Sequence, residues 1–432
     1  MENFTIIGGG IAGLSLGFFL KEKAIIIEKN EKIGGLSRSY NINNVSYDIG
    51  PHIIFSKNKE VLELHKKLVP TNEIKRSNKI FYKKRFIKYP FENDLGSLPK
   101  KEKEYCLQEF LNNPYENYIA ENMQQFFLKT FGEGITKTYL QPYNEKIWKY
   151  DPTFMDVQMV ERIPKPPKED VIKSANGEET EGYKHQLYFN YPKKNGFQSL
   201  IDSYSEENLK KGNKIKTNTQ IEKINKINEG WNIYTNEGLF KSQHLINTAP
   251  IHEFSKYFDL PKDVKKSLND MKYNSIYIVM IQVKKDNLGD NFALYIPTKE
   301  TIFHRLSKID FLGEAYNMSD RNTLMAEVTF RPLSYISSLK KEEVVEEVVT
   351  GLLNEGLIDS REDIIDFEIK YEKYAYVIYD INHRENTDKV LNFFKSIGIN
   401  NVGRFAQFEY LNTDGVVENT LNLSKTLNKL PK

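Results

Sequence analysis

The sequence predicts a mixed α/β fold in which a nucleotide-binding unit, a helical insertion and a second sheet share one chain. Three observations support this prediction. A glycine-rich turn joins an apolar strand to an apolar helix within residues 4–20. Apolar residues recur every three or four positions through 100–163, as on helices packed against a core. Residues 270–380 contain stretches that alternate between apolar and polar side chains, which is typical of strands.

Composition limits the kinds of partner that the protein takes. The chain of 432 residues is long enough for two or three domains, and its 39% apolar and 28% charged residues are typical of globular proteins. Its 61 Lys and Arg residues nearly balance 59 Asp and Glu residues, which argues against nucleic acid as the main partner. The single cysteine, Cys106, and seven scattered histidines predict no disulfide and no metal site.

The sequence also predicts where the protein resides. It starts a strand at once, without the basic and apolar stretches of a signal peptide. No apolar run approaches about 18 residues, the length needed to cross a membrane. We therefore expect a cytoplasmic protein without a membrane span.

The first elements have the spacing of a dinucleotide-binding turn. An apolar strand over 4–7 is followed by a G-x-G-x-x-G turn, a helix to about residue 20 and a strand over 24–27 that ends at Glu28. The turn's glycines are Gly8, Gly10 and Gly13. They allow a tight turn, close approach of a pyrophosphate and close packing of helix on strand, while the acid accepts from ribose hydroxyls.

Three further segments resemble the large FAD-binding family that includes amine oxidases. A second glycine pair follows the acid and leads into residues expected beneath the cofactor's diphosphate, namely Gly35, Leu36, Ser37 and Arg38. "HLINTAP" (244–250) resembles a late strand of the nucleotide fold, and 401–421 resembles the strand, turn and helix that close over the flavin. The resemblance implies FAD rather than NAD, with Arg404 near the diphosphate and Asp414 also binding the cofactor.

These segments predict a discontinuous FAD-binding domain of the glutathione reductase and amine oxidase type. We assign it residues 1–75, 215–255 and 395–432. A helical insertion for nucleotide-base binding spans 100–163, and a mixed or antiparallel substrate-domain sheet with its flanking elements spans 76–99, 185–214 and 256–394. The Pro- and charge-rich stretch 163–186 is expected to form a loop, and 339–357 an amphipathic surface helix.

Motifs outside the shared FAD fold narrow the resemblance. "GPHIIFS" (50–56), "YPFEN" (89–93), "YLQPYNEKIW" (139–148), "VERIP" (160–164), "IFHR" (302–305) and "GRFAQFEY" (403–410) occur in this order. Together they resemble UDP-galactopyranose mutase and its flavoenzyme relatives over nearly the whole chain. The resemblance implies an isomerase that interconverts pyranose and furanose forms of a nucleotide-diphosphate sugar. In that family the N5 atom of reduced flavin attacks the anomeric carbon, with no net redox.

The resemblance also implies roles for individual residues. Arg162 and Arg305 match the family's two diphosphate-binding arginines, and forked, permanently charged guanidinium groups suit that task. The matched phosphate-binding tyrosines are Tyr295, Tyr376 and Tyr410. The residues matched to contacts with the base are Tyr89, Phe91, Glu92, Tyr139, Tyr143 and Asn144.

Two positions depart from the family pattern and leave the base open between uracil and guanine. Family members commonly carry Gln at the position of Glu92 and an indole at that of Ala293. A carboxylate only accepts hydrogen bonds, so it is mismatched to uracil's carbonyls and suits guanine's N1–H and N2–H2 edge. A UDP-galactose-like substrate and a GDP-sugar both remain open.

His52, in "SYDIGPHIIFS", matches a family histidine that lies against the flavin near N5. The expected role is to support the cofactor, not to act as nucleophile. The alternative is a core histidine with a satisfied hydrogen bond.

Two other functions stay open: an amine oxidase-like or desaturase-like oxidoreductase, and a flavin-binding protein without chemistry. The mutase would also need an external reductant, NAD(P)H or reduced flavin. The sequence does not name the sugar or show whether the chain forms a homo-oligomer.

Overall fold

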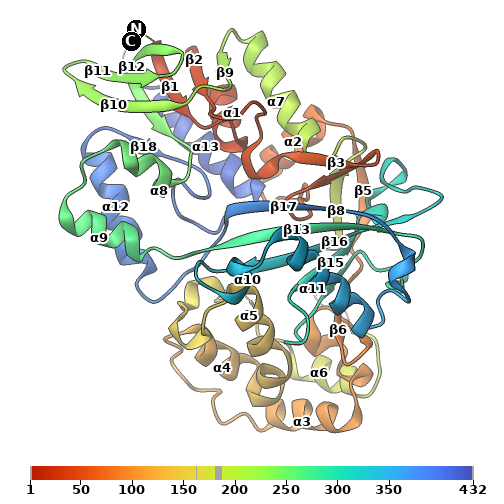
Figure 1. The fold of residues 1–432 in the computed structure, drawn as a ribbon. Helices are drawn as coiled ribbons and strands as arrows, with labels where there is room; N and C mark the ends of the chain where they lie inside the picture. Colours follow the sequence, from red (N-terminus) through yellow and green to blue (C-terminus); the bar gives the residue numbers. More distant parts are fainter. Residues whose placement is uncertain (1, 162, 181–186, 431–432) are drawn as a thin grey trace.

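The computed structural model describes residues 2–161, 163–180 and 187–430, and in Figure 1 they form three parts arranged from top to bottom. The upper part is built on a seven-stranded sheet of order β10-β11-β12-β1-β2-β9, with β18 added beside β12. Its strands are β1 (Glu2–Ile7), β2 (Ala24–Ile27), β9 (Lys214–Lys216), β10 (Ile221–Ile227), β11 (Gly230–Thr235), β12 (Gly238–Asn247) and β18 (Asn400–Asn401). Strand β1 lies between β2 and β12 and is parallel to both.

Three helices pack together beside this sheet. They are α1 (Ile11–Phe19), α7 (Gln198–Lys210) and α13 (Thr413–Leu427). Ser15 of α1 and Thr420 of α13 share a hydrogen bond between their hydroxyls (2.8 Å), and Asn208 of α7 donates to the Leu14 carbonyl (2.8 Å). The helix that follows the glycine turn is thus held from two sides.

A second seven-stranded sheet crosses the middle of the molecule in the order β17-β13-β16-β15-β14-β6-β7. Its strands are β6 (Asn78–Tyr82), β7 (Arg85–Lys88), β13 (Tyr273–Val283), β14 (Ala293–Tyr295), β15 (Arg305–Lys308), β16 (Asn322–Phe330) and β17 (Ile364–Val377). All neighbours are antiparallel except β14 and β6. The predicted mixed sheet is therefore confirmed.

Helix α11 (Lys341–Asn354) matches the amphipathic helix predicted for 339–357. Its buried valines and Leu352 join the apolar core on one face of this sheet, and its exposed residues include Lys341, Glu342, Glu343 and Glu346. The other short elements are β3 (Ser39–Ile42), β4 (Val45–Asp48), β5 (Thr71–Lys75), β8 (Tyr188–Pro192), α2 (Lys59–Leu68), α8 (Ile251–Phe254), α9 (Lys262–Asp270), α10 (Tyr335–Ser338) and α12 (His383–Ser396).

The lower part is helical, as the spacing over 100–163 predicts. It contains α3 (Lys100–Leu111), α4 (Met123–Ile135), a π-helical turn (Thr136–Leu140) and α5 (Gln141–Trp148). Helices α3 and α4 pack closely at Gly134, where an added Cβ would lie 2.6 Å from the Cα of Cys106. The small residue lets the two backbones approach.

The loop predicted for 163–186 is wrong in part, because α6 (Lys168–Ala175) lies within it. Prolines reach only to Pro167, directly before the helix, where a missing N–H costs no helical hydrogen bond. Glu169 and Asp170 occupy the first turn, and Val171 and Ala175 are buried against the helical core. Residues 181–186 lie outside the described part of the chain.

The domain division stays a prediction, and two elements near its boundary at residue 214 pack on the upper part. Helix α7 contacts α1, and β9 pairs with β2 in the upper sheet. The division assigned the segment 185–214 to the substrate domain. Helix α7 lies wholly in this segment, whereas only the first residue of β9 does.

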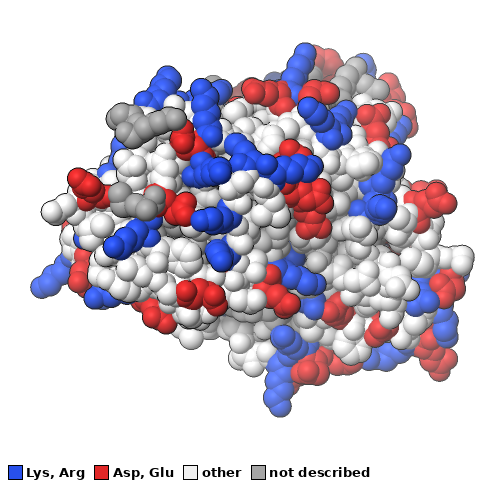
Figure 2. Space-filling model, turned by 90° about the horizontal axis from the view of Figure 1, so that it is seen from above, with Lys and Arg blue, Asp and Glu red and all other residues white. Residues whose placement is uncertain are grey.

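Two surface properties bear on partners. In Figure 2, basic and acidic side chains are interspersed over the visible face, in line with the balanced composition. Within the described residues, no helix combines the length and apolarity that crossing a membrane requires.

Candidate functional site

The glycine turn between β1 and α1 forms one end of the site. An added Cβ on Gly13 would lie 2.0 Å from the Gly8 carbonyl oxygen, so helix and strand pack at a distance that only glycine permits. A Cβ on Gly8 would lie 2.7 Å from Oγ1 of Thr248, whose hydroxyl donates to the Ile7 carbonyl (2.8 Å). Thr248 is therefore a further constraint on the turn.

Gly10 and Gly35 differ from these glycines because space is open beside them. A Cβ on Gly10 would come no closer than 3.8 Å to the surrounding protein, and one on Gly35 no closer than 3.4 Å. Gly10 precedes the first residue of α1, and no side chain caps that helix. Its free N–H groups border an open edge, which is the arrangement that binds a phosphate.

Glu28 lies at the end of β2, as predicted, and orients the turn. Its carboxylate accepts from the backbone N–H groups of Gly9 and Asn30, both at 2.8 Å. An added Cβ on Gly9 would lie 2.9 Å from the Cβ of Glu28. Gly9, which the motif leaves unspecified, is therefore also constrained.

Two predicted arginines are held by backbone carbonyls, which are neutral groups and do not cancel the positive charge of a guanidinium. Arg38 donates to the Lys32 carbonyl (2.9 Å), and Arg404 donates to those of Leu411 (2.7 Å) and Ala375 (2.9 Å). The Nε atom of each is buried without a hydrogen-bond partner among the described residues. These cations, the open glycine edge and Glu28 fit the diphosphate and ribose of a dinucleotide cofactor.

The other predicted cofactor residues lie on the elements around this turn. Gly35, Leu36 and Ser37 form a 3-10 turn directly before Arg38, and Gly34 is bridged to Gly10. Asp414 lies in the first turn of α13, the helix packed on α1.

His52 lies between the glycine turn and the second sheet. Its Nδ1 atom is 3.9 Å from Oδ2 of Asp48, and its ring lies 5.2 Å from that of Phe197. Burial lowers the pKa of His52, the Asp48 carboxylate opposes this, and the charges of Arg404 and Arg305 add to it. His52 is therefore a partly buried, neutral imidazole whose electrostatic neighbours include two predicted ligand-binding cations.

Arg305 forms the most buried ion pair of the site. It lies opposite Glu327 in the β15–β16 register and donates to it through both Nε and Nη2, the latter at 2.8 Å. Glu327 is fully buried, while Arg305 keeps 24% of its side-chain surface exposed. Although burial alone would lower it, the Glu327 carboxylate holds the pKa of Arg305 above its usual value. Arg305 is thus a fixed cation that remains partly exposed.

The predicted base-binding aromatic residues form a continuous cluster together with Tyr295, one of the predicted phosphate-binding tyrosines. The rings of Phe91 and Tyr139 stack at 4.9 Å, and those of Tyr139 and Tyr143 at 5.5 Å. Tyr295 meets Tyr143 edge-on at 5.6 Å and Tyr89 at 5.0 Å. We call this set the tyrosine cluster.

The predicted phosphate-binding tyrosines continue from the tyrosine cluster. Tyr376 and Tyr410 stack at 6.0 Å, and the guanidinium carbon of Arg404 lies 4.4 Å from the Tyr410 ring. The Tyr376 hydroxyl lies 3.4 Å from the Glu327 carboxylate. Asn144 accepts from the Trp148 indole (2.9 Å) and donates to the Leu140 carbonyl, so it is bonded within its own helical segment.

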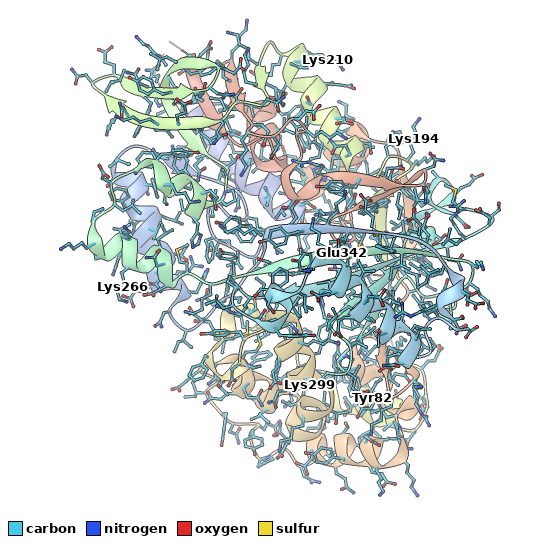
Figure 3. The ribbon with its side chains drawn as sticks, viewed as in Figure 1. Tyr82, Lys194, Lys210, Lys266, Lys299 and Glu342 are labelled. Carbon is cyan, nitrogen blue, oxygen red and sulfur yellow. The ribbon has the colours of Figure 1, made fainter. Side chains whose placement is uncertain are left out.

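A buried lysine fixes the tyrosine cluster to the second sheet. The Lys146 ammonium group on α5 donates to the carbonyls of Ile296 (3.0 Å) and Thr298 (2.6 Å). Lys299, drawn near α5 in Figure 3, lies 3.3 Å from Glu145. These contacts hold α5, which carries Tyr143, beside the loop that follows Tyr295.

Glu92 lies beside the tyrosine cluster and is only 6% exposed. Burial raises its pKa to about 7, and a hydrogen bond from its own backbone N–H opposes this. Its negative charge is among the influences that raise the pKa of the Tyr139 phenol, after burial and the neighbouring Tyr143, Tyr89 and Tyr295. The carboxylate therefore lies within electrostatic range of the Tyr139 hydroxyl.

Sequence reasoning missed three residues of this site. Glu327 pairs with Arg305, Asp48 lies beside His52, and His304 lies between Tyr143 (6.4 Å) and Tyr376 (6.3 Å). A glutamate inside the apolar strand "NTLMAEVTF" and the Asp-x-x-x-His spacing of 48–52 were the available signals. Both ring nitrogens of His304 are buried without a partner in the described part of the chain.

Of the predicted residues, Arg162 lies outside the described residues. The glycine turn with Glu28 forms one group, and the aromatic residues with Arg305 and Arg404 form another. His52 lies in electrostatic range of the latter group's arginines.

Comparisons with known proteins agree with this arrangement. A family model described as flavin containing amine oxidoreductase matches residues 11–354. Coproporphyrinogen III oxidase of Staphylococcus aureus (strain NCTC 8325 / PS 47) is 22% identical over 332 residues, 68% of this chain and 71% of the relative.

Two solved structures share the fold. A reduced UDP-galactopyranose mutase superposes with a TM-score of 0.90 at 22% identity, over 99% of this chain and 94% of that one. A CLA-producing fatty acid isomerase from P. acnes superposes with a TM-score of 0.68 at 14% identity, over 98% of each chain. The predicted fold class is therefore confirmed.

Proposed function

We propose that this chain, which belongs to the flavin-containing amine oxidoreductase family, interconverts pyranose and furanose forms of a nucleoside-diphosphate sugar. Its cofactor is FAD. The proposal takes the reaction to be an isomerisation without net redox.

The main support for a nucleoside-diphosphate substrate is the Arg305 guanidinium and the tyrosines around it. A nucleoside diphosphate needs a flat surface for its base and a forked cation with hydroxyl donors for its phosphates. The tyrosine cluster supplies the first, and Arg305 with the hydroxyls of Tyr376 and Tyr410 supplies the second. Glu327 holds the guanidinium of Arg305 through Nε and Nη2, and 24% of the Arg305 side-chain surface remains exposed.

The chain's residues divide the work of the reaction. Gly10, Arg38 and Arg404 would hold the diphosphate of FAD, and Glu28 its ribose. When bound and reduced, FAD supplies a nucleophilic nitrogen for covalent catalysis at the anomeric carbon. Arg305 stabilises the charge that grows on the departing diphosphate and keeps that group in place for its return. His52 stays neutral and adds no competing positive charge.

A second candidate is an oxidase. The similarity to coproporphyrinogen III oxidase favours it, because that protein's name describes an oxidation and 68% of this chain aligns with it. An oxidase consumes an electron acceptor with every turnover, whereas the proposed isomerase does not.

The test is product analysis with dithionite-reduced protein and a panel of UDP- and GDP-sugars, in parallel with oxygen uptake on amines and porphyrinogens. The proposal predicts a furanose product in the first assay and no substrate-dependent oxygen uptake in the second. Oxygen uptake without any furanose product would refute it and favour the oxidase.

A further inference from the structure

Glu92 is held rigidly beside the tyrosine cluster. It lies in the 3-10 turn Phe91–Asn93, whose first ring stacks on Tyr139. The backbone carbonyl of Glu92 accepts from the Ser174 hydroxyl of α6 (2.7 Å), and Thr180 donates to the carbonyl of Asn93 (3.2 Å). The backbone of the turn that carries Glu92 is therefore anchored at two successive carbonyls.

Among the described residues, none supplies the partner that a buried, ionised Glu92 carboxylate requires. Among the described residues it forms no ion pair, and the bond from its own backbone N–H is its one hydrogen bond. A buried charge without partners costs free energy, and the protein retains this one beside its flat aromatic surface. The Glu92 carboxylate is therefore suited to accept hydrogen bonds from a ligand.

The donors that fit follow from the chemistry of the bases. An ionised carboxylate offers two acceptor oxygens and no donor. Guanine presents adjacent N1–H and N2–H2 groups, which pair with both oxygens, whereas uracil presents one N–H between two carbonyls that would repel them. We infer that Glu92 selects the base, and that the site beside the tyrosine cluster takes a guanosine-diphosphate sugar in preference to a uridine-diphosphate sugar. This inference rests on the proposed function.

Equilibrium binding tests the inference without turnover. The affinities of GDP and UDP for the oxidised, FAD-loaded protein are measured by calorimetry at pH 8.5. We expect wild type to bind GDP at least about tenfold more tightly than UDP, as for one bidentate pair. Glu92→Gln should lose at least about tenfold in GDP affinity and gain affinity for UDP, because an amide can donate to a uracil carbonyl. Glu104→Gln is the matched control, an exposed glutamate on α3 whose loss should change neither affinity.

A measurement on wild type alone guards against a variant that does not fold. Because burial raises the pKa of Glu92 to about 7, the carboxyl is mostly protonated at pH 6 and then carries a donor. The ratio of GDP to UDP affinity should therefore rise between pH 6 and pH 8.5.

The outcomes separate the inference from the proposed function. UDP binding tighter than GDP binding, with no response to Glu92→Gln or to pH, would overturn the choice of base and leave the proposed function standing. Failure of both nucleotides to bind would overturn both.

Discussion

Arg305 is the side chain on which recognition of phosphate depends most. Arg305→Lys keeps the charge but loses the forked geometry that engages Glu327 and a phosphate together. We expect a loss of about tenfold to a hundredfold in kcat/KM, the range for one charge-assisted hydrogen bond. Steady-state kinetics on the nucleotide sugar measure this.

Arg321→Lys is the matched control for that variant. Its side chain is 23% exposed, close to the 24% of Arg305, and pairs with the neighbouring Asp320. Equal losses in the two variants would contradict a specific role for Arg305.

Glu92 makes stability depend on pH. Its pKa in the folded protein, about 7, lies above the ordinary 4.5, so the folded state binds the proton more tightly. The stabilising contribution of the protonated group is complete below pH 4.5 and is lost as pH rises through 7. At pH 8.5 the ionised group destabilises the fold by at most about 3 kcal/mol, from 1.36 kcal/mol per pKa unit.

Glu92→Gln removes this penalty. The Tm of the variant should exceed that of wild type by a margin that grows between pH 5 and pH 8.5, measured by thermal melting of the FAD-loaded proteins. A margin independent of pH would contradict the buried, unpartnered carboxylate.

His52 supports the reaction and is not needed to retain the cofactor. His52→Ala should keep FAD, seen as the flavin absorbance of the purified protein, and lose most turnover. The reason is that the neutral imidazole, with Asp48 beside it, lies within electrostatic range of Arg305 and Arg404. Full activity would show that His52 is a core histidine.

Among the elements, the turn between β1 and α1 contains one glycine that the fold requires, Gly13, and one that cofactor binding requires, Gly10. Gly13→Ala places a methyl group 2.0 Å from the Gly8 carbonyl oxygen, so it should yield an unfolded or insoluble protein. Gly10 has an extended backbone (φ −79°, ψ −178°) and no neighbour within 3.8 Å of an added Cβ. Gly10→Ala should therefore fold and fail to bind FAD. Circular dichroism and flavin absorbance together distinguish the two, and a Gly10→Ala protein with full FAD content would refute the phosphate site.

Elements were predicted where the signal is local. The glycine turn, its flanking strands and the helices of 100–163 follow from spacing within about 20 residues. Helix α6 was missed because three prolines (Pro164, Pro166 and Pro167) precede it, although they end where the helix begins. Its burial against 3-10 turns from residues 91–97 is a tertiary effect that no local pattern reveals.

In the whole molecule, residues distant in the sequence are brought together by strand pairing, and the sequence alone did not reveal these partners. The motif "IFHR" identified Arg305, but its partner Glu327 lies 22 residues away and meets it through the register of β15 and β16. Likewise, His304 joins Tyr143 and Tyr376 only because the helical insertion packs against the second sheet. The glycine turn, Glu28 and Arg38 lie in one continuous segment, whereas Arg404 and the residues of the substrate end come from separate segments.

The central claim is isomerisation without net redox, and the stoichiometry of reductant tests it most directly. Protein reduced once under anaerobic conditions is given an excess of the nucleotide sugar, and furanose product is counted per flavin by chromatography. The account predicts many products per flavin while the flavin remains reduced. No furanose product from any nucleotide sugar, or one product per reducing equivalent consumed, would contradict it.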